Sequence, residues 1–206
     1  MKTTNVHFIL DKSGSMTSVR EATISGFNEY IQTLRKDTKS KYNLTLTVFD
    51  TEVTALEVNT PLSKVKELTS ENYIPSGMTA LYDAACSTIQ KVKKSTAKNL
   101  VVIMTDGEEN SSKEYTQKEL GKIIKDLEAK KNWTFVFLGA NQDSWNVAQK
   151  FGMKQGNVAN YNATFKGMGE TMRTMASNTV AFSASLQDNT AEYFSAEDKA
   201  KLENTK

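Results

Sequence analysis

Three short polar segments of the sequence carry side chains whose oxygen atoms could hold a metal ion. The first segment contains Asp11, Ser13 and Ser15, the second contains Thr79, and the third contains Asp106. Because this set offers carboxylates and hydroxyls without an imidazole or a thiolate, it suits a hard cation such as Mg²⁺, Mn²⁺ or Ca²⁺ and suits zinc or copper poorly. Mg²⁺ keeps near-octahedral geometry and retains waters, so hydroxyl ligands with carboxylates set behind those waters would suit it best.

The elements around these segments are expected to bring them to one place. The apolar run Val6 to Leu10 predicts a strand that ends at Asp11, and Leu100 to Met104 predicts a strand buried on both faces that ends before Asp106. The turn from Ser76 to Thr79 precedes a helical pattern. Since ligands bind at the carboxyl ends of the strands in open α/β sheets, we expect the three segments to meet there.

The rest of the chain alternates between strand and helix patterns. Two alternating runs with a turn at residues 50–51 predict a hairpin, one strand of which forms a sheet edge. Ser18 with Glu21, and Thr116 with Glu119, have the form of capping boxes at helix starts. Strands are expected at residues 44–49, 52–58 and 133–138, with a weak extended piece at residues 158–161. Helices are expected at residues 19–34, from near Thr79 to residue 92, from a cap at Thr116 to residue 127, at residues 144–151 and at residues 165–175. This order predicts an α/β fold, doubly wound, with a mostly parallel central sheet, one antiparallel edge strand and helices on both faces.

The polar segments resemble, in order and in local sequence, the metal-ion-dependent adhesion site of von Willebrand factor A-type domains. Residues 9–16 (ILDKSGSM) resemble its first loop, residues 77–81 (GMTAL) its second loop and residues 104–107 (MTDG) its third loop. The resemblance covers about residues 4–176 and weakens after Gly139. It implies the Rossmann-like fold of that family.

The end of the chain departs from the family pattern. We therefore divide the chain into an A-type domain, residues 1–176, and a polar C-terminal tail, residues 177–206. Within the tail, Ser195 with Asp198 predicts one short capped helix that runs towards Leu202. Whether the tail docks on the domain is left open at this point.

The resemblance also implies a division of roles within a complete adhesion site. Ser13, Ser15 and Thr79 would bind the ion directly, whereas Asp11 and Asp106 would act mostly through water. Without a direct protein carboxylate, the charge of the ion is only partly offset, and its open position attracts a Glu or Asp from a protein partner. We therefore expect a divalent-cation-dependent adaptor or interaction domain that is not an enzyme, with Mg²⁺ as the ion and Mn²⁺ or Ca²⁺ as alternatives.

Two other functions are weighed against this one. A metal-dependent hydrolase or phosphatase-like enzyme would use similar groups, but a haloacid-dehalogenase-like phosphatase needs an aspartate where Ser13 stands, and the sequence has neither a Gly-x-Ser-x-Gly elbow nor a P-loop. An RNA-associated A-type protein is the second alternative, although a formal net charge of +2 disfavours nucleic acid. Intracellular relatives of the family act as adaptors, so assembly with an ATPase complex is a further expectation.

The composition favours a reducing compartment. Cys86 is the only cysteine, so no intramolecular disulfide can form. The longest aliphatic stretch, Leu100 to Met104, is far shorter than the roughly 20 residues of a membrane span. The N-terminus has no continuous apolar region of the kind found in signal peptides. We therefore expect a cytoplasmic protein of bacterial or phage origin with no membrane association.

Overall fold

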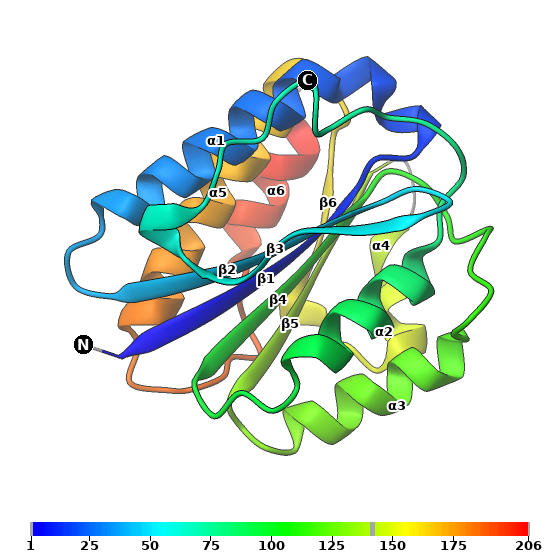
Figure 1. Cartoon of the computed structure of the whole chain (residues 1–206). Helices are drawn as coiled ribbons and strands as arrows, with labels where there is room; N and C mark the ends of the chain where they lie inside the picture. The colour runs from blue at the N-terminus through cyan, green and yellow to red at the C-terminus, as the bar shows by residue number, and fades with distance from the viewer. Residues whose placement is uncertain (1, 141–142, 206) are drawn as a thin grey trace.

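A six-stranded sheet forms the centre of the protein (Figure 1). The computed structural model describes residues 2–140 and 143–205. Neighbouring strands are parallel except at one edge, where β3 pairs antiparallel with β2, and the strand order is β3-β2-β1-β4-β5-β6. The strands are β1 (Thr3–Asp11), β2 (Lys41–Phe49), β3 (Val53–Pro61), β4 (Lys98–Thr105), β5 (Trp133–Ala140) and β6 (Val158–Tyr161). The predicted fold class, including the antiparallel edge strand, is confirmed.

Helices cover both faces of this sheet (Figure 1). One face carries α1 (Arg20–Lys36), α5 (Phe165–Ala184) and α6 (Ala196–Asn204), and the other carries α2 (Leu81–Val92), α3 (Gln117–Glu128) and α4 (Ser144–Ala148). Within the described part of the chain, none of the helices is long and apolar enough to cross a bilayer. Side chains that alternate along β1 enter two separate cores, so that Phe8 joins the first core and Ile9 the second. Because both faces are covered, β4 and β5 are buried along their whole length, as their largely apolar sequences predict.

The observed first residues of the helices show whether the capping boxes expected from the sequence are present. The box at Thr116 begins α3, and the box at Ser195 begins α6, so these two predictions are confirmed. The box expected at Ser18 is wrong, because Gly14–Val19 forms a 3₁₀ helix that leads into α1 without a side-chain cap. This short helix buries Met16 completely and thereby fixes the polar loop after β1 against the core.

Helix α5 extends beyond the pattern that predicted it. It continues to Ala184, so the division made at residue 176 falls inside this helix. Its later buried positions mix the polar Thr179 and Ser183 with the apolar Phe182, and the polar pair weakens the apolar periodicity. Thr179 Oγ1 lies 3.1 Å from Tyr30 OH of α1, which ties this polar stretch to the neighbouring helix.

The residues after α5 return to the sheet and pack against it. The backbone N–H of Tyr193 donates to Asn157 Oδ1 at 2.9 Å, and Leu202 of α6 is fully buried. Phe194 and Leu202 belong to the same apolar core as α1 and α5. The C-terminal segment is therefore docked on the sheet.

Candidate metal centre

The edge where the parallel strands end carries the residues predicted to bind a metal. Asp11 is the last residue of β1, Asp106 follows β4, and Thr79 precedes α2. Ser13 and Ser15 lie in and beside the 3₁₀ turn after β1. Four of the five residues have exposed fractions of 8% or less, whereas Ser15 is exposed. Ser15 therefore marks the open side of an otherwise buried cluster.

Direct contacts join the two serine hydroxyls to a carboxylate. Ser13 Oγ lies 3.1 Å from Ser15 Oγ, and Ser15 Oγ donates to Asp106 Oδ1 at 2.6 Å. Two ligands that each lie about 2.1 Å from Mg²⁺ at neighbouring corners of an octahedron are about 3.0 Å apart. The two hydroxyls thus have the spacing that neighbouring ligands of such an ion require.

Gly107 lies beside three hydroxyl groups of the first and second loops. A β-carbon at this position would lie 3.2 Å from Thr79 Oγ1, 3.8 Å from Ser15 Oγ and 4.0 Å from Ser13 Oγ. The φ angle of Gly107 is outside the left-handed region, so space and not backbone conformation favours glycine. The structure therefore brings the hydroxyl of the second loop and those of the first to the same side of Gly107.

Asp11 is fully buried, and both of its carboxylate oxygens accept hydrogen bonds. Oδ1 accepts the Ser13 N–H at 2.6 Å, and Oδ2 accepts the Thr105 hydroxyl at 2.5 Å. Burial raises the pKa of Asp11 to about 6, and the negative charge of Asp106 adds to this rise while the hydrogen bonds oppose it. Burial also raises the pKa of Asp106, against the hydrogen bond from Ser15.

The two carboxylates lack a positive partner in the described part of the chain. Neither Asp11 nor Asp106 forms an ion pair with a lysine or arginine there, and Lys12 instead pairs with Asp50. Among residues 2–140 and 143–205, no three His, Cys, Asp or Glu side chains gather in a metal-binding group. A metal centre at this edge therefore depends on the serine and threonine hydroxyls, and the donor set and the unpaired negative charge both fit a hard cation.

Two residues that the sequence analysis did not assign to the site hold its loops in place. Asp50, interpreted from the sequence as a turn residue in preference to a site residue, accepts hydrogen bonds from Lys12 Nζ and, at 2.9 Å, from Ser76 Oγ, so it joins the first loop to the second. Asn110 Oδ1 accepts the Thr79 N–H at 2.8 Å, and Asn110 N–H donates to Thr79 O at 3.0 Å. The place of Asp50 directly after a strand was a usable signal, whereas no sequence pattern pairs Asn110 with Thr79.

Two buried tyrosines lie close to the carboxylates. Tyr73 OH donates to the backbone oxygen of Asp11 at 2.6 Å. Tyr161, at the end of β6, is buried, and its hydroxyl has no hydrogen-bond partner among the described residues. Burial raises the pKa of both phenols, and the negative charges of Asp11 and Asp106 raise it further. Both side chains therefore stay neutral beside the site.

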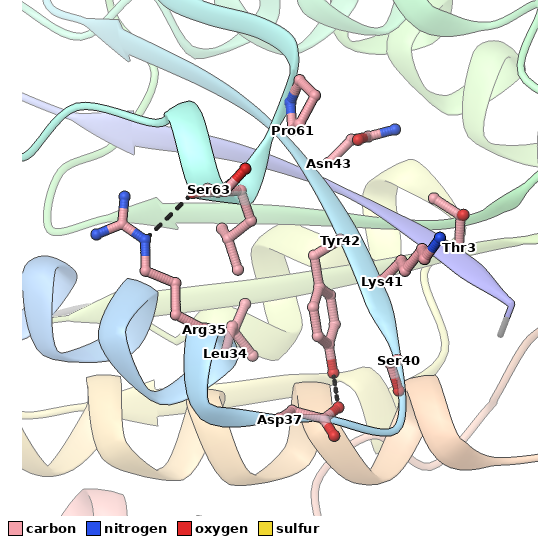
Figure 2. A pocket seen from close by; sticks show the side chains of 11 residues that line it. Thr3, Leu34, Arg35, Asp37, Ser40, Lys41, Tyr42, Asn43, Pro61 and Ser63 are labelled. Carbon is pink, nitrogen blue, oxygen red and sulfur yellow. Dashed lines mark hydrogen bonds between the residues drawn. The ribbon is translucent and has the colours of Figure 1, made fainter.

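A separate groove lies at the opposite end of the sheet (Figure 2). Its volume is about 680 Å³, and it is lined by Thr3 and Lys41 at the starts of β1 and β2 and by Pro61 at the end of β3. Inside it, Tyr42 OH donates to Asp37 Oδ2 at 2.6 Å. None of the five predicted metal-binding residues lines this groove, so it is distinct from the candidate metal centre.

Comparison with known sequences identifies one family. The family model described as "von Willebrand factor type A domain" matches residues 5–174 of the chain. No curated protein matches the chain. The match includes all three loops of the candidate metal centre.

Solved structures of similar fold share little sequence with this chain. Proximal thread matrix protein 1 from the mussel byssus is 13% identical, with a TM-score of 0.63 over 87% of this chain and 46% of that chain. The PilB minor pilin from Streptococcus sanguinis is 12% identical, with a TM-score of 0.66 over 87% of this chain and 61% of that chain. The vWF domain of the type V pili tip protein Mfa5 from Porphyromonas gingivalis is 10% identical, with a TM-score of 0.66 over 89% of this chain and 97% of that chain. In a further structure of the mussel protein, zinc occupies the MIDAS motif, the metal-ion-dependent adhesion site.

Proposed function

Because the chain belongs to the von Willebrand factor type A domain family, we propose that it is a divalent-cation-dependent protein-binding domain. The proposed site is a metal-ion-dependent adhesion site in which Ser13, Ser15 and Thr79 hold Mg²⁺ through their hydroxyls. Asp11 and Asp106 act through water. A bound Mg²⁺ supplies a directional electrostatic contact to a Glu or Asp side chain of a protein partner.

The convergence of three hydroxyl groups beside Gly107 is the observation that carries this proposal. Hydroxyls are neutral, so they leave most of the charge of a cation uncompensated and available to an acidic group from outside. Both carboxylate oxygens of Asp11 already accept hydrogen bonds, from Ser13 and Thr105, which favours contact with the ion through water over direct binding. Ser15 is the exposed member of the set, so we expect the partner to approach from its side.

A hydrolase at this site would have to use a carboxylate as its general base, because no imidazole is available there. The one histidine, His7, lies inside β1 with its Nε2 3.1 Å from Asn99 Oδ1, and burial lowers its pKa to about 4. The solved neighbours are described as a thread matrix protein, a minor pilin and a pili tip protein, which favours a binding role. We therefore propose recognition without bond breaking, and rank a metal-dependent hydrolase below it.

The ion and the setting are part of the proposal. Mg²⁺ is our first choice and Mn²⁺ or Ca²⁺ the alternatives, and the zinc-occupied motif of the mussel protein makes Zn²⁺ a further ion to test. A formal net charge of +2 offers RNA little attraction. We propose a protein partner in the cytoplasm, with an ATPase complex as one candidate assembly.

Isothermal titration with each of these ions tests the proposed site. Three variants accompany the parent: Asp11→Ala, Thr79→Ala and the control Thr54→Ala, which removes an exposed threonine from β3. We expect one ion per chain for the parent and the control, and binding weaker by roughly tenfold or more for the two site variants. Equal binding by all four proteins would contradict the site.

Partner binding is tested separately from ion binding. A fluorescein-labelled peptide with a single Asp should bind the parent in Mg²⁺ and be released by EDTA, whereas a peptide with Asn in its place should not bind. A protein that binds Mg²⁺ at the site yet treats both peptides alike would contradict the protein-binding function.

A further inference from the structure

A polar cavity lies at the amino ends of β1 and β2, on the side of the sheet that α2 covers. Its volume is about 410 Å³, within the range of small-molecule binding sites. Most of its lining side chains are polar, and the apolar ones are Val58, Val92 and Ala97. Asn5, which lines the cavity, and Asp11 lie near opposite ends of β1, so the cavity is about 20 Å from the metal centre.

A row of asparagines supports one wall of this cavity. Asn43, Asn5 and Asn99 occupy paired positions on β2, β1 and β4. Asn43 Nδ2 donates to Asn5 Oδ1 at 3.1 Å. Asn5 Nδ2 donates to Ser95 Oγ at 2.8 Å and to Asn99 Oδ1 at 3.3 Å. Because these bonds hold the amides in one arrangement, the wall needs little reordering when a polar ligand binds.

His7 adds a hydrogen-bond acceptor without a donor to the inner part of the cavity. Its Nε2 lies 3.1 Å from Asn99 Oδ1, and Asn99 Nδ2 donates to Ala97 O at 2.6 Å, which identifies Oδ1 as the amide oxygen. Nε2 therefore carries the proton, and Nδ1 is the acceptor of the neutral ring. Nδ1 has no hydrogen-bond partner in the described part of the chain, and His7 is 1% exposed. Since His7 lines the cavity, a ligand there can supply the missing donor.

Two lysines give the rim of the cavity a positive charge. Lys91, in α2, and Lys94, three residues later, both line the cavity and are both exposed. Neither forms an ion pair within residues 2–140 and 143–205, and none of the lining residues described there is Asp or Glu. The rim therefore attracts an anionic group, and the lysine ammonium is a common partner of phosphate.

We propose that this cavity binds a small phosphorylated sugar or polyol. The hydroxyl groups of the ligand donate to His7 Nδ1 and exchange hydrogen bonds with the amide of Asn43. The phosphate group lies beside Lys91 and Lys94. Hydroxyls suit the inner wall because they both donate and accept hydrogen bonds. Among the described residues, no Phe, Tyr or Trp side chain lines the cavity, so a nucleobase would find little to stack on.

Titration calorimetry in EDTA tests the cavity apart from the metal centre. The protein is titrated with ribose 5-phosphate, with ribose and with inorganic phosphate. We expect one ribose 5-phosphate to bind per chain, about tenfold or more tightly than either smaller compound, because each of those makes only part of the contacts. Absence of ribose 5-phosphate binding, or equal affinity for ribose 5-phosphate and inorganic phosphate, would overturn the proposal.

Two pairs of lysines provide a variant and a matched control. Lys91→Ala with Lys94→Ala removes the charges at the cavity, whereas Lys36→Ala with Lys39→Ala removes two exposed lysines of the same spacing at the end of α1. We expect the first double variant to bind ribose 5-phosphate weaker by roughly tenfold or more, and the control to bind it as the parent does. An equal loss in both double variants would show general charge attraction and contradict a site at this cavity.

The imidazole of His7 reports on the inner wall. His7 is the only histidine in the sequence, so the ¹⁵N resonances of its two ring nitrogens need no assignment among histidines. We expect the Nδ1 resonance to move upfield as ribose 5-phosphate saturates the protein, because Nδ1 gains a hydrogen-bond donor, while Nε2 stays protonated. Saturation that leaves the Nδ1 resonance in place would put the ligand elsewhere and refute the proposal.

Discussion

Replacing Gly107 with alanine adds one methyl group beside the hydroxyls of Ser13, Ser15 and Thr79. The new carbon would lie 3.2 Å from Thr79 Oγ1, inside the roughly 3.5–4.0 Å at which non-bonded heavy atoms pack best, so the hydroxyl or the loop must move by a few tenths of an ångström. Mg²⁺ demands near-ideal octahedral geometry and tolerates such a displacement poorly. We expect its affinity to fall by roughly tenfold to a hundredfold, a loss of about 1.4 to 2.7 kcal/mol.

Two measurements separate this effect from a general loss of stability. Isothermal titration calorimetry gives the Mg²⁺ affinity, and thermal unfolding in EDTA gives the stability of the metal-free protein. Because Gly107 has no left-handed φ, we expect the metal-free free energy of unfolding to change by less than about 1 kcal/mol.

A matched control is available in α5. In Gly169→Ala, the β-carbon would lie 3.4 Å from Nη1 of Arg173, the end of a flexible side chain, so this variant should keep the Mg²⁺ affinity of the parent. If the Gly107→Ala protein also binds Mg²⁺ as tightly as the parent, the idea that the ion lies between these hydroxyls is refuted.

Three further predictions follow from the same structure. Mg²⁺ affinity should decline as the pH falls below about 6, because burial raises the pKa of Asp11 to that value and protons then compete with the ion. Titration calorimetry at several pH values should show a weaker decline in Asp11→Asn than in the parent. Burial lowers the pKa of His7 to about 4, so between pH 6.5 and 4 the unfolded chain binds more protons than the folded protein does. Up to about 3 kcal/mol of the free energy of unfolding should therefore be lost as the pH falls through that window. Urea unfolding of His7→Gln should show a smaller loss, and an unchanged loss would count against this reasoning. In Gly156→Ala the β-carbon would lie 2.2 Å from Ala191 O, so the docked segment 185–205 must shift at a cost of about 1–3 kcal/mol, and limited proteolysis should cut it faster than in the parent.

The strand and helix patterns predicted most of the fold because local and long-range requirements agree in this chain. The apolar runs in β4 and β5 match strands covered on both faces, and the capping box at Thr116 matches the start of α3. The failures have physical causes. The polar loop after β1 winds into a 3₁₀ helix, which moves the start of α1 past Ser18. The buried face of α5 includes the polar Thr179 and Ser183 beside Phe182, so its apolar periodicity weakens before the helix ends.

The five oxygen-bearing residues of the candidate site could be predicted from the sequence, as most of the fold could. Strand ends and the loop motifs together predicted that Asp11, Thr79 and Asp106 would meet at one edge, and the structure brings them together with the two serines. The residues that hold the loops were not predictable in the same way. Asp50 and Asn110 act through contacts between segments far apart in the chain, and such contacts depend on the tertiary fold and not on local sequence.

Anomalous diffraction from crystals grown with Mn²⁺ tests the central claim most directly. We predict one manganese peak per chain at the carboxyl edge of the sheet, within bonding distance of the Ser13, Ser15 and Thr79 hydroxyls, with at least one ligand position taken by water or by an acidic group of a neighbouring molecule. A map with no peak there, or with the manganese bound directly by both Asp11 and Asp106 and no open position, would contradict the account.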